Sequence, residues 1–309
     1  MKKALLFLLN VAILSLAGCK SSEEATSSVF TSSSKKEPVI YEPEYTITKE
    51  YIGTSTDSNN SMFNVENVEQ HDSILEDKTI YFLGSSVTYG ANSDGKAMGE
   101  YLAALTGCTI KKEAVSGTTI QNESGKTNSY TQRLENTAEF DIDAEIDAFV
   151  CQISTNDAYN STRLGRLGRL SPEDQIESDS FDRNTTYGGL EFIVTYVTET
   201  WGCPVFFYSG AYFGDGSGTR KSSAPTGSNY KKIIDATYDV AEKYNAYQDF
   251  EVFIIDLFND EDFNDAADDE YYKWATNDPV HPKKAGYLQW WTPYFEAYLS
   301  NYFEGNLSV

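Results

Sequence analysis

Short apolar runs alternate with longer segments along most of the chain, and this alternation is the feature that most constrains the fold. Five runs are expected to form strands: Thr79–Leu83, a segment from Thr109 onward, Ala148–Ile153, Pro204–Tyr208 and Val252–Ile255. Four segments between and after them are expected to form helices: 97–106, 189–201, 228–244 and 283–301. Apolar strands that alternate with helices indicate a parallel sheet covered on both faces. The sequence therefore predicts an α/β domain with a mainly parallel, five-stranded sheet.

Polar residues that could do chemistry follow the first three predicted strands, where open parallel sheets form their ligand crevices. Gly84-Ser85-Ser86 comes after the first strand. A glycine there lets the backbone turn sharply, and a serine just beyond it can start a helix whose N–H groups favour negative charge. Gly117, after the second strand, could serve a turn or expose its N–H to a substrate oxygen. Asn156, after the third, could be a turn residue or an amide donor.

One of the only two histidines in the chain stands close to a carboxylate. His281 follows Asp278 by three residues, in the run Asp-Pro-Val-His-Pro. An imidazole suits proton transfer near neutral pH, and an acidic neighbour fixes its tautomer and steadies its charged form. His71 lies in a polar run and is expected at the surface. We therefore expect His281 to be a catalytic base that Asp278 orients.

The serine, glycine, asparagine and Asp-x-x-His occur in this order and at successive strand ends, and this joint pattern resembles the SGNH (GDSL-like) hydrolase family. The resemblance covers about residues 78–298. It implies a three-layer α/β/α flavodoxin-like fold and a serine hydrolase without a cofactor or metal. By position, Ser86 matches the nucleophile, Gly117 and Asn156 the oxyanion donors, and His281 with Asp278 the base and its orienting acid.

Two positions depart from the family's usual pattern. Ser85 stands where the family usually has an aspartate before the nucleophile, so either serine could attack, and the register favours Ser86. Ser154 stands where the family usually has a glycine two residues before the asparagine. We expect its added side chain to narrow the crevice.

Charge and composition restrict the partners. A formal charge of -23 and a pI of about 4.4 argue against nucleic acid, anionic lipid surfaces and other acidic polymers, because a phosphate-binding surface needs clustered Lys and Arg. The aromatic content of 14%, including Trp290-Trp291, could supply platforms for sugar rings or core packing. The acidic stretch 260–265 lacks the glycine that a calcium loop of the EF-hand type needs, and we expect a solvated loop there, with no metal.

The N-terminus is typical of an exported lipoprotein. Two lysines precede the apolar run Ala4–Leu16, which is too short for a membrane span and ends in Leu-Ala-Gly-Cys19. This ending resembles a bacterial lipobox, which implies cleavage before Cys19 and a diacylglycerol on its sulfur, although an ordinary secretory signal is the alternative. We expect a signal peptide at 1–18, a flexible Ser/Thr-rich tether at 19–43 and the hydrolase domain at 44–309. The domain would then sit on the outer face of a bacterial membrane.

Without Cys19, three cysteines remain, and an odd number cannot form a complete disulfide framework. Cys108, Cys151 and Cys203 lie in or beside apolar runs. Buried, unpaired thiols are expected, with a bridge between Cys151 and Cys203 as the open alternative.

Two classes of function fit these features. The first is a membrane-tethered serine esterase that acts on O-acyl groups, with O-acetylated carbohydrate as the preferred substrate class. A lysophospholipase, a thioesterase or an O-acetyltransferase would use the same residues. The second is a lipoprotein that binds a glycan or a small solute without turnover. Against it stands the intact set of Ser86, Gly117, Asn156 and His281, which a pure binding protein has no chemical reason to keep.

Overall fold

A computed structural model of the chain describes residues 57–136, 144–159, 163–169, 171–172, 180–212, 227–265, 278, 280–307 and 309. The chain divides into two units, Met1–Pro38 and Val39–Val309. The predicted signal peptide, Cys19 and the tether lie outside the described residues, so these remain predictions. Within the described part of the chain, no helix combines the length and the apolar character that a membrane crossing requires.

The core of the second unit is a five-stranded sheet, as predicted. Its strands are β1 (Thr79–Gly84), β2 (Thr109–Ala114), β3 (Ala148–Gln152), β4 (Val205–Tyr208) and β5 (Val252–Ile255). They pair in the order β2-β1-β3-β4-β5, and every pair is parallel. This is the flavodoxin-like strand order, in which the chain reverses its direction across the sheet between β1 and β3. A crevice at that switch point is the usual ligand site of such folds.

The burial of each strand follows its place in the sheet. β3 and β4 lie inside the sheet and are buried along their whole length, as β1 is after its first residue. β2 lies at the edge and has the polar sequence TIKKEA, none of it fully buried. The expectation of apolar strands therefore holds for β1, β3 and β4 and also for the other edge strand, β5, whose sequence is VFII, but not for β2.

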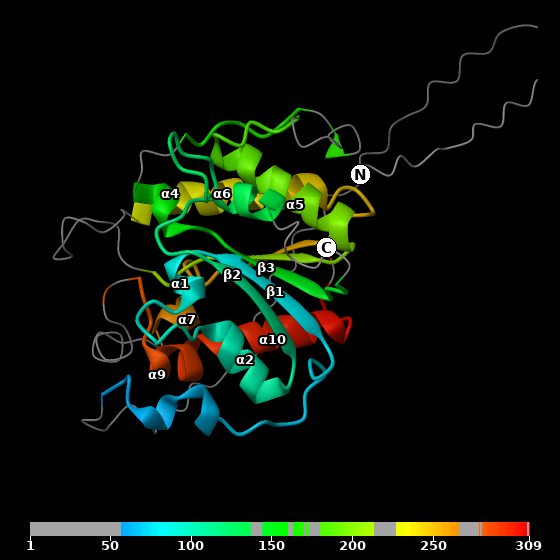
Figure 1. The fold of residues 1–309 in the computed structure, drawn as a ribbon. Coiled ribbons are helices and arrows are strands. Elements are labelled where there is room, and N and C mark those ends of the chain that lie inside the picture. Colours follow the sequence, from blue (N-terminus) through cyan, green and yellow to red (C-terminus); the bar gives the residue numbers. More distant parts are fainter. Residues whose placement is uncertain are drawn as a thin grey trace, which may run out of the picture. The chain divides into compact units, whose positions relative to one another are not determined.

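Helices cover both faces of the sheet and form two separate cores (Figure 1). One face carries α3 (Tyr130–Asn136), α4 (Thr155–Tyr159), α5 (Thr186–Trp201) and α6 (Gly227–Tyr244). The other carries α2 (Met98–Thr106), α7 (Glu261–Asp265), α9 (Lys284–Gly286) and α10 (Thr292–Phe303). The four-residue helix α1 (Ser86–Tyr89) follows β1 directly, and two 3₁₀ turns, Ser61–Phe63 and Val65–Asn67, precede the sheet.

The last predicted helix is not continuous. A π-helical turn, Tyr287–Trp291, separates α9 from α10. Pro293 stands in the first turn of α10 and has no N–H to donate to the carbonyl four residues earlier, so the regular bonding pattern cannot run through this point.

One expectation about this region was wrong and another was decided between its alternatives. Part of the acidic stretch 260–265 forms helix α7 instead of a loop, because Phe263 is fully buried and stacks on Trp290 at 4.5 Å between ring centroids. Of the two roles considered for Trp290 and Trp291, core packing is the one observed, so neither can serve as a platform for a sugar. The cysteine prediction is confirmed: Cys108, Cys151 and Cys203 are free and buried, without a bridge between the last two.

Candidate active site

The turn that leaves β1 presents one of its two serines to the histidine. A side chain at Gly84 would collide with Thr88, since a Cβ built there lies 1.7 Å from its Oγ1, so the turn requires glycine. Ser85 is fully buried, and its Oγ donates to Gln152 Oε1 at 3.1 Å. Ser86 begins α1, and its Oγ lies 2.7 Å from His281 Nε2. Of the two candidates left by the sequence, Ser86 is the one in contact with the imidazole.

Asp278 holds the other side of the imidazole. His281 Nδ1 lies 2.9 Å and 2.8 Å from the two carboxylate oxygens, which are acceptors, so Nδ1 carries the proton and Nε2 offers its lone pair to Ser86. The backbone N–H groups of Val280 and His281 also donate to Asp278 Oδ1, at 2.8 Å and 2.9 Å. Partial burial alone would raise the pKa of Asp278, but these hydrogen bonds and the adjacent imidazole outweigh it and lower the pKa. The carboxylate therefore stays ionised at neutral pH.

The other histidine lies away from these groups. The His71 side chain is 47% exposed, and its Nε2 contacts Glu296 Oε1 on α10 at 2.6 Å. Its position at the surface was predicted from the sequence.

The two predicted oxyanion donors lie on the segments that follow β2 and β3. Gly117 adopts a φ of 79°, and a Cβ built there meets no atom within 4 Å, so its backbone borders open space. Asn156 is in the first turn of α4, and its Nδ2 donates to the carbonyl of Thr118 at 3.0 Å. That bond uses one amide hydrogen and fixes the side chain, which leaves the second amide hydrogen as a donor.

Ser154 does not narrow the crevice, contrary to the expectation from sequence. It is fully buried, and its Oγ donates to the Thr118 carbonyl at 3.0 Å and accepts the N–H of Asn156 at 3.1 Å. A serine in this place caps the start of α4. Ser154 therefore fixes the segment that carries Asn156 and does not occupy the crevice.

Comparisons with known proteins identify the family and the fold. The GDSL-like Lipase/Acylhydrolase family matches residues 82–288, which is more than half of the chain. The chain belongs to this family. No match was found among curated protein sequences.

Solved structures share the fold of this GDSL-like acylhydrolase at low sequence identity. One has a TM-score of 0.57 and 21% identity, with 73% of this chain and 97% of the other covered. A protein from Lactobacillus plantarum has a TM-score of 0.53 and 20% identity, with 77% and 100% covered. Axe2, an acetylxylan esterase from Geobacillus stearothermophilus, is more distant, at a TM-score of 0.46 and 16% identity, with 72% and 96% covered. The first two likenesses establish the α/β fold.

Gln152 supports the turn that carries Ser85 and Ser86, and it was missed in the sequence. Its Oε1 accepts hydrogen bonds from the Ser85 N–H at 2.9 Å and from Thr88 Oγ1 at 2.9 Å, besides the Ser85 hydroxyl. A glutamine at the end of an otherwise apolar, buried strand was the available signal, because a buried amide needs partners. A polar side chain of β3 therefore holds Ser85 in place.

Arg133, on α3, joins the ends of the first two strands and was also missed. Its guanidinium donates to the carbonyls of Gly84 at 2.8 Å and Glu113 at 3.2 Å, and to Thr118 Oγ1 at 3.1 Å. It also forms an ion pair with Glu113 Oε1 at 2.9 Å. The side chain thus holds the turn after β1, which carries Ser86, beside the segment that carries Gly117. Arg133 lies outside the four motifs, so no local pattern pointed to it.

Asp157 joins the two segments that carry the oxyanion donors. It is fully buried, and it accepts the backbone N–H groups of Ile120 at 2.9 Å and Gln121 at 3.4 Å. Burial raises its pKa from 3.8 to about 7, although the bonds from those two N–H groups act in the opposite direction. The position next to Asn156 gives this carboxyl group a supporting role in the site.

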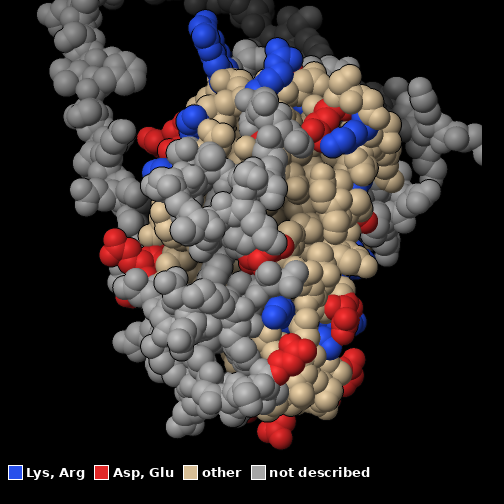
Figure 2. All heavy atoms as spheres, turned by 90° about the vertical axis from the view of Figure 1, so that its left-hand side faces the viewer, with Lys and Arg blue, Asp and Glu red and all other residues tan. Residues whose placement is uncertain are grey.

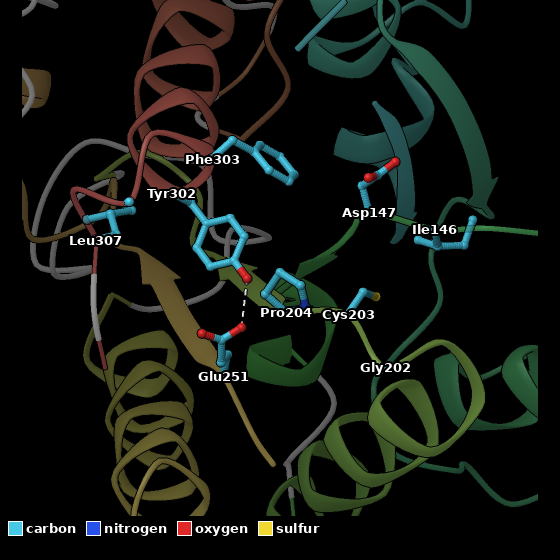
Figure 3. Close-up of a pocket in the computed structure, with 10 residues that line it drawn as sticks. Ile146, Asp147, Gly202, Cys203, Pro204, Glu251, Tyr302, Phe303 and Leu307 are labelled. Atoms are coloured by element: carbon cyan, nitrogen blue, oxygen red, sulfur yellow. Dashed lines mark hydrogen bonds between the residues drawn. The ribbon is translucent and has the colours of Figure 1, made fainter. Parts of the chain in front are cut away.

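The face on the left-hand side of Figure 1 shows separate small groups of basic and acidic side chains on its described part (Figure 2). A cavity of about 540 Å³ lies elsewhere, beside Cys203, Pro204 and Glu251, at the residues that immediately precede β4 and β5 (Figure 3). Tyr302 donates to Glu251 across it at 2.6 Å. Burial raises the pKa of the Cys203 thiol to about 12, so the thiol is not a nucleophile at neutral pH. Because the amino ends of parallel strands lie opposite their carboxyl ends, this cavity is separate from Ser86.

Proposed function

We propose that this GDSL-like acylhydrolase is a serine esterase that hydrolyses O-acyl esters through an acyl-enzyme on Ser86. The observation that carries the proposal is the continuous chain of hydrogen bonds from Asp278 through His281 to Ser86 Oγ. A hydroxyl is a weak nucleophile unless a base removes its proton, and here the base is held in the tautomer that can do so.

The reaction follows from these positions. His281 Nε2 takes the Ser86 proton as Oγ attacks the ester carbonyl, and the carbonyl oxygen becomes an oxyanion. The Ser86 and Gly117 N–H groups and the free hydrogen of the Asn156 amide stabilise that charge. The imidazolium then gives its proton to the leaving alcohol oxygen, which leaves an acyl-enzyme. A water molecule, deprotonated by His281, attacks the acyl carbon, and the serine regains its proton as the acid departs.

The proposed substrates are O-acetyl groups on extracellular carbohydrate. Two tyrosines support this choice, because an exposed aromatic ring can stack on a sugar. Tyr89 ends the helix that Ser86 begins and is 46% exposed, and Tyr212 follows β4 and is 45% exposed. Both belong to segments that leave the carboxyl ends of strands.

We also propose that the protein is exported and anchored through a lipid on Cys19 to the outer face of a bacterial membrane. The support is the N-terminal sequence alone: two lysines, a short apolar run and Leu-Ala-Gly-Cys. Stable anchoring requires more than one acyl chain, and a diacylated cysteine provides two. This location would place the crevice where extracellular polysaccharides are available.

The proposal is tested with the soluble chain that begins at Lys20. It should release nitrophenol from nitrophenyl acetate faster than from longer acyl esters, and acetate from acetylated xylan. Ser86→Ala and His281→Gln should each abolish hydrolysis, whereas His71→Gln, which changes the exposed histidine, should not. Full activity in Ser86→Ala would contradict the assignment. Preference for long acyl chains would favour a lysophospholipase, and retention on a glycan without hydrolysis of any ester would favour a binding protein.

A further inference from the structure

A short segment ahead of the sheet contacts both of the loops that surround the catalytic groups. We call residues 57–67 the strap, residues 90–96 the serine-side loop and residues 281–286 the histidine loop. The serine-side loop follows α1 and is tied to it, because the N–H of Ala91 donates to the carbonyl of Ser86 at 3.1 Å. From its sequence the strap is only part of a polar lead-in to the first strand.

A single side chain of the strap bridges the two loops. Asn59 Oδ1 accepts the backbone N–H of Lys284 at 3.0 Å, in the histidine loop. Its Nδ2 donates to the carbonyl of Asn92 at 3.0 Å, in the serine-side loop. Both partners are backbone groups, so the amide fixes the course of the two loops themselves. The orientation of Asn59 is fixed in turn by Asp57, whose Oδ1 accepts the Asn59 N–H at 3.0 Å.

Lys284 forms a second link between the same three segments. Its Nζ is 2.6 Å from Asp94 Oδ2 in the serine-side loop and 2.7 Å from Asn64 Oδ1 in the strap. Asn64 begins a 3₁₀ turn without capping it, so its side chain is committed to the lysine. Asp94 has a φ of 52°, a conformation that non-glycine residues rarely adopt, and the ion pair holds the residue there. The carbonyl of Ser58 accepts the Ala285 N–H at 3.0 Å in addition.

The strap is itself anchored to the body of the domain. Phe63 of the strap is buried, with 3% of its surface exposed. The Phe63 carbonyl accepts a hydrogen bond from the hydroxyl of Tyr101 on α2 at 2.8 Å. The strap is therefore a fixed support for the two loops and not a mobile lead-in.

We propose that Asn59 is a positioning residue that holds the histidine loop beside the serine-side loop at the separation where Ser86 and His281 meet. This inference rests on the proposed esterase function. Ser86 and His281 are 195 residues apart in the chain, so their 2.7 Å contact depends on how the two loops are held together. A displacement of about 1 Å can cost a reaction about 10²-fold in rate. Other ties remain without Asn59, because Lys284 still pairs with Asp94 and the Tyr287 hydroxyl still donates to the Val87 carbonyl at 2.7 Å.

The experiment compares two neighbouring asparagines in the chain that begins at Lys20. Asn59→Ala removes the bridge. Asn60→Ala is the matched control, because among the described residues the Asn60 side chain bonds the Met62 N–H, which lies within the strap itself. With active sites titrated by a serine-reactive phosphonate, kcat for nitrophenyl acetate should fall about 10-fold in Asn59→Ala, with KM nearly unchanged. Asn60→Ala should keep the kcat of the unchanged chain.

The rate at which the phosphonate itself reacts separates positioning from general stability. That rate depends on how well His281 activates the Ser86 hydroxyl, so if Asn59 positions the two residues the rate should fall in parallel with kcat. A purely structural role would instead lower the melting temperature and leave the rate per folded molecule unchanged. Asn59→Asp keeps the acceptor for Lys284 and loses the donor to Asn92, so its kcat should be intermediate. Equal kcat in the two alanine variants, whether high or low, would overturn the proposal. An error in the proposed esterase function would be seen separately, because Ser86→Ala would then keep full hydrolysis.

Discussion

In the proposed reaction, the imidazole ring of His281 decides the direction of proton transfer. Both Asp278 oxygens face Nδ1 of His281, so Nε2 is free to accept the hydroxyl proton of Ser86. The two hydrogen bonds from backbone N–H groups keep the carboxylate ionised and in place. Because Asp278 and His281 are three residues apart, the local chain alone can bring them together, whereas Ser86 must be brought by the fold.

A second single residue, Asn156, should also affect the rate. Asn156→Ala should lower kcat by about 10²- to 10³-fold and change KM little, because the free amide hydrogen of Asn156 acts on charge that develops only in the transition state. The cost in stability should be small, since Ser154 Oγ still donates to the Thr118 carbonyl that Asn156 leaves. Steady-state kinetics with nitrophenyl acetate measures the effect, and Asn306→Ala, at an exposed asparagine, is the control. A variant that loses affinity while kcat is retained would contradict the oxyanion role.

Between elements, the site depends on α4 staying attached to the segment that follows β2. Asp157 accepts two backbone N–H groups of that segment, and the adjacent Ser154 and Asn156 bond its Thr118 carbonyl. The two potential oxyanion donors, Gly117 and Asn156, therefore move as one unit. Short helices have few internal hydrogen bonds, so such contacts, and not helix propensity, hold α4 in place.

Asp157 should also make stability depend on pH. Its carboxyl group keeps its proton up to about pH 7 in the folded protein but loses it near pH 3.8 when unfolded, so the folded state binds more protons in between. Its contribution to stability is therefore complete below pH 3.8 and is lost as the pH rises through 7. The free energy of unfolding of the unchanged chain, minus that of Asp157→Asn, should fall between about pH 4 and about pH 8.

Urea denaturation followed by circular dichroism at several pH values measures this difference. Asp72→Asn, at an exposed aspartate, shows what the removal of a surface carboxylate does by itself. A difference that stays constant or rises with pH would show that Asp157 is ionised in the folded protein.

For the whole molecule, the proposed lipid anchor predicts where the protein is found. Cys19→Ser in the full chain should move the protein from the membrane fraction to the soluble exported fraction, because the sulfur that carries the diacylglycerol is gone. Fractionation of expressing cells, with mass spectrometry of the N-terminus, measures this. Hydrolysis per molecule should not change, since Cys19 precedes the strap by many residues. Unaltered membrane association of an unacylated protein would exclude the anchor.

The sequence by itself determined the α/β class, the five strands and the four motifs at strand ends. These depend on periodicity and on spacing over a few residues, which neighbouring side chains set locally. It left open whether Trp290 and Trp291 lie in the core, because their burial depends on packing against Phe263 of α7. The break at Tyr287–Trp291 was not predicted, although Pro293, which interrupts the bonding pattern, is visible in the sequence.

The register of the resemblance favoured Ser86 over Ser85, and only the tertiary structure shows the contacts that distinguish the two serines. The choice depends on which hydroxyl meets His281 and which meets Gln152, and both partners lie far along the chain. The supporting residues also contact partners that are distant in the sequence: Arg133 reaches β1 from α3, and Asn59 reaches the histidine loop from ahead of the sheet. Contacts between segments distant in sequence leave no periodic pattern, so they become visible only once the chain has folded.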